Sequence, residues 1–389
     1  MKTSNILSFL GLFLVSASAV PNQNYVDWKT FKANGVNLGG WLVQEAVLDA
    51  GFWSQYGGNT TDEWGFCVRL GSQCGPVLER RYATYFQPAD IDKLAKAGVT
   101  ILRIPTHYAA WIKVPGSQLY TGNQIQFLKN IATYAITKYN MHVIVDVHSL
   151  PGGLNGLGIG EKDGNYGWFN NGTALEYSYR TIDAVVQYVQ TSGFPQSYTI
   201  APLNEPVDNR DFSKFGTPDA LSINGAAWVA KFINGVLSRV AALNPKIPVM
   251  VQGSFRPETF WSPYFPSDAN IVFDSHHYYF AGRPTTSDNI PTFICEDAKG
   301  SISDGKFPVF IGEWSIQALS NNTFASRAKN LNDGLYAWSK YTQGSSYWTA
   351  KFSGTDPVNG QGTQSDYWNY ETFIDLGIID PASSVGFCP

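Results

Sequence analysis

Two glutamates in this chain follow short apolar runs in a way that suits acid–base chemistry. Glu205 follows residues 198–203, and Glu313 follows residues 309–312. Retaining hydrolysis of a glycosidic bond needs one carboxyl group to donate a proton and a second, ionised one to attack carbon, with the two about 5 Å apart. The environments of the two groups must then differ, because only one of them keeps its proton.

Candidate partners distinguish the two glutamates. Arg103 offers a cation to Glu313, and the hydroxyl group of Tyr278 offers a hydrogen bond. Both stabilise a carboxylate anion, which favours the role of nucleophile for Glu313. A purely structural ion pair is the alternative role for Arg103.

Polar groups around Glu205 suit the other role. The amide of Asn204 can bond the 2-hydroxyl group of a sugar, a contact that strengthens in the transition state. His148 and His276 can hold substrate hydroxyls or orient the carboxylates. For each histidine an ordinary buried hydrogen bond is the alternative.

The segments that position these groups alternate between strands and helices. Eight runs are almost continuously apolar, as in strands buried on both faces of a parallel sheet: residues 35–40, 99–104, 142–148, 198–203, 247–251, 271–274, 309–312 and 346–348. Helical spacing of apolar residues is found at 89–95, 122–140, 174–192, 222–243 and 324–340. No Gly-x-Gly-x-x-Gly follows the first run, which removes the fingerprint of a dinucleotide fold. We predict an α/β chain built as a single (β/α)8 TIM barrel with elaborated loops at the C-terminal face.

Six of the apolar runs end in polar or aromatic residues. These are Arg103, Asp146 with His148, Asn204 with Glu205, His276 with Tyr278, Glu313 and Trp348. In a (β/α)8 barrel the carboxyl ends of all strands meet on one face, where active sites lie. The distribution therefore predicts one site at that face.

On these residues the chain resembles glycoside hydrolase family 5, and within it the fungal exo-β-1,3-glucanase-like branch. The motifs are Val36-Asn37-Leu38-Gly39-Gly40-Trp41, Leu102-Arg103-Ile104-Pro105, Asp146-Val147-His148, Leu203-Asn204-Glu205-Pro206, His276-His277-Tyr278 and Ile311-Gly312-Glu313-Trp314-Ser315. The resemblance implies a retaining mechanism without cofactor or metal, with Glu205 as acid/base and Glu313 as nucleophile. It also implies a glucose subsite lined by Glu45, Arg103, His148, Asn204, His276, Tyr278 and Trp348.

The chain departs from the exo-β-1,3-glucanase pattern where that branch clamps its glucan. The two clamp phenylalanines correspond to Leu157 and Ala281, with Phe280 as a neighbouring substitute, and the His-Gly-Ala-Pro-Gly segment has become His148 followed by residues 149–152. The Glu-Pro of the first loop has become Glu45-Ala46. Such a site is wider, which favours the related diglycosidases that release the disaccharide from 6-O-α-rhamnosyl-β-glucosides such as rutin.

Other activities remain as alternatives. An exo-β-1,3-glucanase acting on cell-wall glucan is the first, and a catalytically silent sugar-binding barrel is the second. The retention of Glu205 and Glu313 speaks against a silent barrel. A metal-dependent hydrolase barrel would need His-x-His at the first strand, and residues 34–42 contain no His.

The remaining features predict a secreted protein. Residues 1–19 read as a signal peptide, which leaves residues 20–389 as one hydrolase domain. Four cysteines allow three pairings, and the closeness of Cys67 and Cys74 favours that pair, with Cys295 joined to Cys388. Sequons lie at Asn59, Asn171 and Asn321. With a net charge of −4 and 12 Trp, we expect a β-glucoside or β-glucan substrate, a monomer, and no nucleic-acid or membrane partner.

Overall fold

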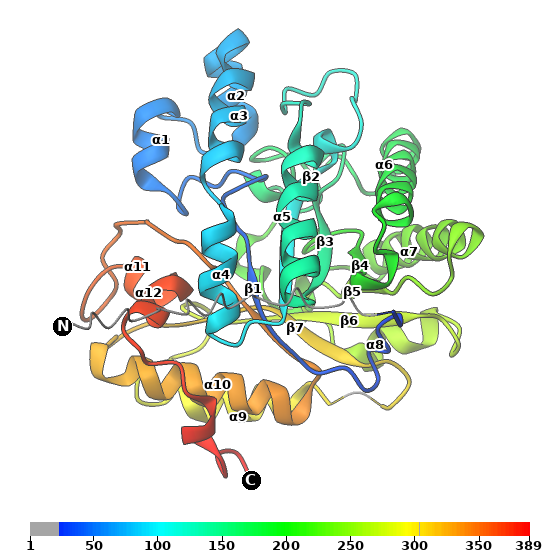
Figure 1. Ribbon diagram of the computed structural model, residues 1–389. Helices are drawn as coiled ribbons and strands as arrows, with labels where there is room; N and C mark the ends of the chain where they lie inside the picture. Colours follow the sequence, from blue (N-terminus) through cyan, green and yellow to red (C-terminus); the bar gives the residue numbers. More distant parts are fainter. Residues whose placement is uncertain (1–22, 303) are drawn as a thin grey trace, which may run out of the picture.

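The eight predicted strands form a closed, parallel barrel in chain order (Figure 1). The computed structural model describes residues 23–302 and 304–389, so the predicted signal peptide, residues 1–19, lies outside the described residues. The strands are β1 (Ala33–Asn37), β2 (Ile101–His107), β3 (His142–Ser149), β4 (Tyr198–Ala201), β5 (Val249–Gln252), β6 (Ile271–Tyr279), β7 (Val309–Ala318) and β8 (Gly344–Tyr347). The (β/α)8 prediction is confirmed.

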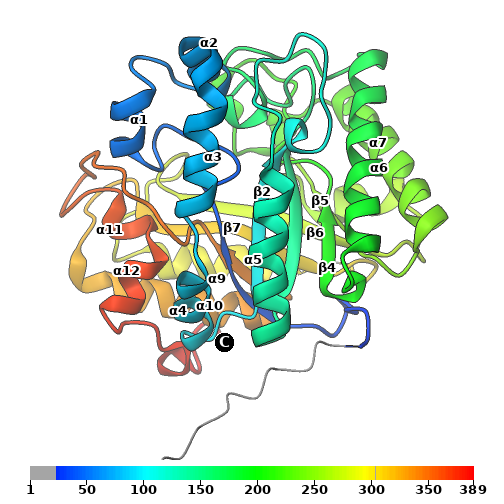
Figure 2. The ribbon, with the colours of Figure 1, turned by 45° about the horizontal axis from the view of Figure 1, so that its top comes forward.

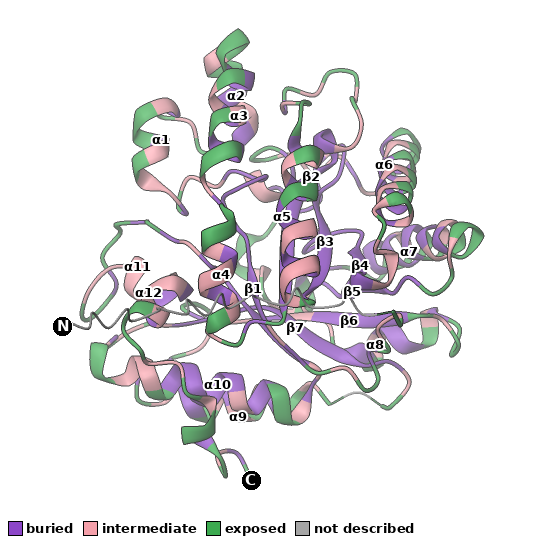
Figure 3. Ribbon diagram, viewed as in Figure 1, coloured by how far each residue is buried: buried purple, intermediate pink, exposed green. Residues whose placement is uncertain are grey.

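Helices surround the barrel (Figure 2), and they carry both buried and exposed residues (Figure 3). They are α1 (Ala50–Tyr56), α2 (Glu63–Leu70), α3 (Cys74–Thr84), α4 (Pro88–Lys96), α5 (Gln124–Tyr139), α6 (Gly172–Thr191), α7 (Ile223–Leu243), α8 (Glu258–Trp261), α9 (Ile290–Gly300), α10 (Arg327–Tyr341), α11 (Ser365–Trp368) and α12 (Tyr370–Asp375). Five of them, α4, α5, α6, α7 and α10, match the helical patterns of the sequence. The helices between β1 and α4, the helices α8 and α9, and those after β8 were not predicted.

The barrel interior consists of an apolar layer beneath a polar one. The lower layer contains Ala33, Ile101, Ile144, Ala201, Met250, Val272 and Phe310, and Trp28 packs against it. Because side chains in a strand alternate between two faces, the residues two positions further on also point inward. At three of those positions stand Arg103, Asp146 and Asp274, all buried. The change from apolar to charged residues marks the end of the barrel that holds the site.

Two disulfides join the pairs of cysteines expected from the sequence. Cys67 is bonded to Cys74 across the α2–α3 junction, and Cys295 in α9 is bonded to Cys388 near the C-terminus. The second bond attaches the chain that follows β8 to the outer layer of helices. Among the described residues α7 is long and apolar enough to suit a membrane, but its buried Val229 and Ile233 belong to the main core of the barrel.

Candidate active site

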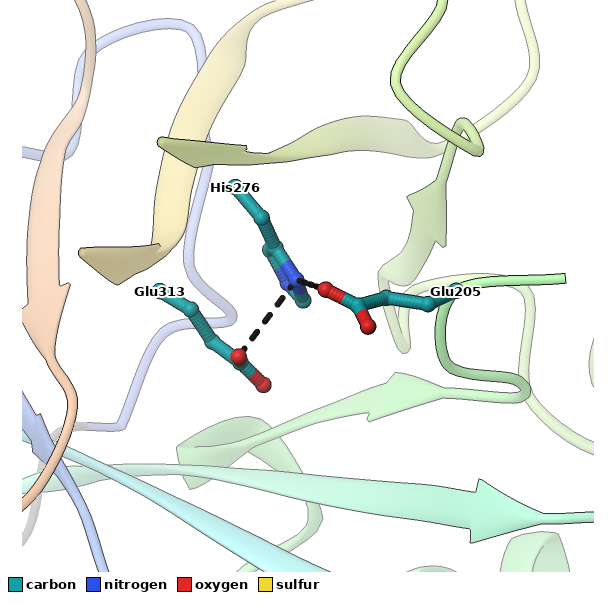
Figure 4. A group of neighbouring side chains, drawn as sticks. All are labelled: Glu205, His276 and Glu313. Atoms are coloured by element: carbon teal, nitrogen blue, oxygen red, sulfur yellow. Dashed lines mark hydrogen bonds and ion pairs between the residues drawn. The ribbon is translucent and has the colours of Figure 1, made fainter. Parts of the chain in front are cut away.

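Glu205 and Glu313 face each other at the carboxyl end of the barrel (Figure 4). A carboxylate oxygen of Glu205, one of Glu313 and a ring nitrogen of His276 all lie within 4.8 Å of one another. Each glutamate keeps only 4% of its surface exposed. Carboxyl groups about 5 Å apart are the arrangement of retaining glycosidases, since inverting enzymes leave more room for a water molecule.

A bulge in β7 turns Glu313 toward the barrel axis. Phe310 points inward, so strict alternation would place Gly312 inward and Glu313 outward. The pairing with β6 shifts after Ser275, and His276 then lies opposite Glu313. Gly312 is required here, because a Cβ atom at this position would lie 2.0 Å from Oδ1 of Asp274.

Glu313 accepts hydrogen bonds from a cation and a phenol. Nη1 of Arg103 donates to Oε1 over 2.7 Å, and the hydroxyl group of Tyr278 donates to Oε2 over 2.7 Å. Burial and then the negative charge of Glu313 raise the pKa of Tyr278 well above its usual value, so the phenol keeps the proton that it donates. Both bonds stabilise the carboxylate form that a nucleophile needs.

Arg103 lies beneath the carboxylates, with no exposed surface. Nη1 also donates to Oδ1 of Asn37 (3.0 Å), Nη2 donates to Oδ1 of Asn204 (2.8 Å), and Asp146 lies 3.2 Å from Nη2. The sequence placed Arg103 in the lining of the glucose subsite. The structure places it under that lining, where it orients Glu313 and Asn204.

A second chain of hydrogen bonds orients Asn204 from the other side. Asp146 accepts from Nδ1 of His148 over 2.6 Å, and Nε2 of His148 lies 3.3 Å from Nδ2 of Asn204. With its proton on Nδ1, His148 accepts at Nε2 from the amide of Asn204, and the second amide hydrogen is left for a ligand. The ring of Trp348 stacks on His148, with centroids 5.8 Å apart.

His276 lies between three carboxylates. Nδ1 lies 2.7 Å from Oε1 of Glu205 and Nε2 lies 3.3 Å from Asp274. Burial alone lowers the pKa of His276, but Glu313 and Asp274 outweigh burial and raise this pKa well above its usual value. A proton on Nδ1 of His276 is donated to Oε1 of Glu205, which leaves Oε2 of Glu205 free for the substrate. His276 and Arg103 already supply the positive charge that a metal ion would bring to this cluster.

Glu45, on the loop that follows β1, lies close enough to Glu313 and Glu205 to interact with their charges. Its Oε1 is buried and has no hydrogen-bond partner among the described residues. Burial, together with the charges of Glu313 and Glu205, raises the pKa of Glu45 from 4.5 to about 8. A half-buried glutamate with an unpaired carboxyl oxygen, beside the two catalytic candidates, is suited to bind sugar hydroxyls, as the sequence predicts.

The raised pKa of Glu45 predicts a dependence of stability on pH. The folded protein keeps this proton up to about pH 8, whereas the unfolded chain loses it near 4.5. The contribution of Glu45 to the free energy of unfolding therefore decreases as the pH rises through this window. In Glu45→Gln the side chain stays neutral at every pH. We therefore expect the melting temperature of the variant to rise relative to that of the wild type as the pH increases from about 5 to about 9. Melting curves that run parallel over this range would contradict the prediction.

The two positions aligned with the glucan clamp differ from each other in the structure. Leu157 is half-buried, Ala281 is exposed, and Phe280 keeps 39% of its surface exposed. Phe280 and Tyr278 both pack on Trp368 of α11, each with ring centroids 5.3 Å from it. Trp368 was not predicted; it comes from the segment after β8 and packs against the ends of β6 and β7 through Tyr278 and Gln317.

Apart from Arg103 and Glu313, which lie within β2 and β7, the predicted catalytic and substrate-binding residues come from the carboxyl-terminal halves of strands or the loops that follow them. Sequence reasoning placed Asp146 at this face without giving it a role, and it gave no role to the supporting residues Asn37 and Asp274. A signal for two of them was present: Asp146 and Asp274 stand two residues before His148 and His276, at inward positions of buried strands. Asp-x-His with this alternation places each carboxylate beneath a ring nitrogen.

A closed (β/α)8 barrel with two facing carboxylates at its carboxyl end is the arrangement of a retaining glycoside hydrolase. The family model "Cellulase (glycosyl hydrolase family 5)" matches residues 71–354, more than half of the chain. The protein belongs to glycoside hydrolase family 5, whose members act with retention of configuration.

Relatives and solved structures extend this comparison. The chain is 29% identical to a probable glucan 1,3-beta-glucosidase A of Aspergillus niger, over 79% of this chain and 72% of that one. It is 27% identical to glucan 1,3-beta-glucosidase 1 of Schizosaccharomyces pombe, with 89% of each covered. The crystal structure of rutinosidase from Aspergillus niger shares 58% identity with a TM-score of 0.91, over 92% of this chain and 100% of that one. The structure of AoRut shares 64% identity, with the same coverage and TM-score.

Proposed function

We propose that this protein hydrolyses 6-O-α-rhamnosyl-β-glucosides of flavonoids, such as rutin, and releases the intact disaccharide with retained configuration. The observation that carries the proposal is the 58% identity to the rutinosidase of Aspergillus niger over 92% of this chain. The pair of carboxylate oxygens within 4.8 Å supports a double displacement.

In the first step Glu313 attacks the anomeric carbon while Glu205 gives its proton to the glycosidic oxygen. The bond to the aglycone breaks and a covalent glycosyl-enzyme forms on Glu313. In the second step Glu205, now ionised, takes a proton from water, and the water oxygen displaces Glu313. Two inversions at one carbon leave its configuration unchanged. Arg103 and Tyr278 stabilise the Glu313 carboxylate at the start and at its release.

The other predicted residues bind the glucose unit. Asn204 presents an amide hydrogen to the 2-hydroxyl group, and Glu45 accepts from the hydroxyls on the far side of the ring. Trp348 offers an aromatic face for the apolar side of the sugar. His148 and His276 act mainly by orienting Asn204 and Glu205, because their ring nitrogens already have protein partners.

Hydrolysis of β-1,3-glucan is the second candidate. The curated relatives named glucan 1,3-beta-glucosidase favour it, but their identity to this chain is 26–29%. The clamp positions Leu157 and Ala281 carry no aromatic ring, which weakens stacking on a glucan chain. A sugar-binding protein without activity would have no use for a nucleophile paired with Arg103 and Tyr278.

Product analysis separates the two activities. Incubation of the purified protein with rutin should release rutinose and quercetin, and the disaccharide should form first in its β configuration. Laminarin should release glucose at less than about one hundredth of that efficiency, a difference of about 2.7 kcal/mol in transition-state binding. Glucose from laminarin without rutinose from rutin would assign the protein to the glucanases.

We also propose that residues 20–389 act as a single secreted, monomeric hydrolase domain after removal of residues 1–19. Two disulfides support an oxidising compartment. The sequon residues Asn59, Asn171 and Asn321 are exposed, as glycan attachment requires.

A further inference from the structure

The loop that follows β3 is attached to the segment of the acid/base at two points. Nδ2 of Asn155 donates to the carbonyl oxygen of Glu205 over 3.1 Å, and the backbone N–H of Val207 donates to the carbonyl oxygen of Leu154 over 3.0 Å. Pro206, between the two bonds, has no N–H of its own to contribute. Two consecutive residues of the loop therefore hold the chain on both sides of this proline.

Glu205 needs external support because of its backbone conformation. Its φ is +43°, in the left-handed region that residues with a side chain rarely adopt. The ladder between β3 and β4 ends with Ala201 opposite Asp146, so Glu205 lies beyond regular strand pairing. A buried carbonyl group in such a position requires a hydrogen-bond donor. The conformation of this residue decides where its carboxyl group lies relative to Glu313.

Asn155 is itself fixed in one orientation. Its Oδ1 accepts from the backbone N–H of Leu157 over 3.1 Å, so its Nδ2 must be the atom that faces Glu205. A Cβ atom on Gly160 would lie 2.3 Å from Oδ1, and one on Gly156 would lie 2.1 Å from the ring of Tyr166. Asn155 keeps only 1% of its surface exposed. The donor to Glu205 is thus held in place before substrate binds.

The loop is also anchored away from Glu205. Glu161, which is buried, accepts from the hydroxyl group of Tyr108 over 2.6 Å and from the N–H of Gly152 over 3.1 Å. Asp62 accepts from the N–H of Asp163 over 2.7 Å. Because the loop is fixed at these points, its hydrogen bond can hold the backbone of Glu205 in one position.

We propose that Asn155 is a positioning residue of the acid/base, which holds the left-handed backbone of Glu205 so that its carboxyl group meets the glycosidic oxygen. The proposal rests on the proposed function, because it assigns proton transfer to Glu205. Asn155 acts through the carbonyl group of Glu205 and leaves Glu313 unaffected. A displacement of about 1 Å in a reacting group can cost about 100-fold in rate. Replacement of Asn155 should therefore slow the steps in which Glu205 transfers a proton.

The test is the dependence of rate on the leaving group. Asn155→Asp keeps the acceptor for Leu157 and removes the donor to Glu205, and Asn155→Ala removes the amide without adding charge. On aryl β-glycosides of the sugar that the wild type releases, both variants should lose about 10- to 100-fold in kcat/KM with phenol as leaving group. With 2,4-dinitrophenol, which needs no protonation, the loss should stay below about 3-fold. The basic limb of the pH profile of kcat/KM should also shift.

Asn209→Asp is the matched control. Asn209 has the same arrangement, with Nδ2 donating to the carbonyl oxygen of Asp219 and Oδ1 accepting from the N–H of Asp211, both over 3.0 Å, but it does not contact Glu205. This variant should keep the leaving-group dependence and the pH profile of the wild type.

The outcomes distinguish a failure of the role proposed for Asn155 from a failure of the acid/base role proposed for Glu205. Equal losses on all leaving groups in both Asn155 variants would show a structural role and overturn the inference. If Glu205→Ala, measured alongside, also lacked any leaving-group dependence, the acid/base assignment itself would fail. A steep dependence in Glu205→Ala with none in Asn155→Ala would reject the role of Asn155 alone.

Discussion

Replacing Glu313 by glutamine should reduce turnover of every glycoside substrate by about 10⁴-fold or more, because no covalent intermediate can form without the carboxylate. The loss should be similar for rutin and for dinitrophenyl glycosides, since attack on the anomeric carbon is common to both. Steady-state rates of quercetin and dinitrophenol release measure it directly.

Glutamine is preferred to alanine because Arg103 is fully buried under this site. The Oε1 atom of the introduced glutamine can still accept a hydrogen bond from Nη1 of Arg103. Asp146 and Asp274 continue to balance the guanidinium charge. Leaving a buried ion without its partner costs about 3–5 kcal/mol, which an alanine variant would risk. The melting temperature of Glu313→Gln should therefore stay within a few degrees of the wild type. A folded variant that kept more than about 1% of activity would disprove the assignment of the nucleophile.

Replacing Glu205 by alanine should separate substrates by their leaving groups. A general acid contributes about 10²- to 10⁴-fold, so kcat/KM for rutin or a phenyl glycoside should fall by about 10³-fold. With 2,4-dinitrophenol the first step needs no proton donor, and kcat/KM should fall by less than about 10-fold. Loss of the base then slows the second step, so the glycosyl-enzyme should accumulate and a burst of dinitrophenol should precede slow turnover.

Azide provides the control for this variant. It attacks the glycosyl-enzyme without losing a proton, so it should restore turnover of the dinitrophenyl glycoside by Glu205→Ala and give a β-glycosyl azide. It should not accelerate the wild type, in which Glu205 already activates water. An α-configured azide product would mean that the two glutamates have exchanged roles.

Much of the scaffold was predictable because hydrophobic periodicity is local. All eight strands and five of the helices follow from apolar runs and helical spacing, and the rule that strands of such a barrel share one carboxyl end placed Glu205 and Glu313 on the same face. The disulfide pairs followed from the short separation of Cys67 and Cys74. The strand ends were less accurate: β6 and β7 continue past 274 and 312 because they pair with each other through an irregular register.

The amino-acid sequence by itself determined which residue types reach the site and in what order, because each strand carries its own polar residues toward the shared carboxyl end of the barrel. Only the tertiary structure decided how the side chains of these residues are oriented. The inward turn of Glu313 depends on a bulge at Gly312, whose space is filled by Asp274 of the neighbouring strand. The left-handed backbone of Glu205 depends on a donor fifty residues earlier, Asn155. These features arise from contacts between segments far apart in the chain, so no local pattern of residues encodes them.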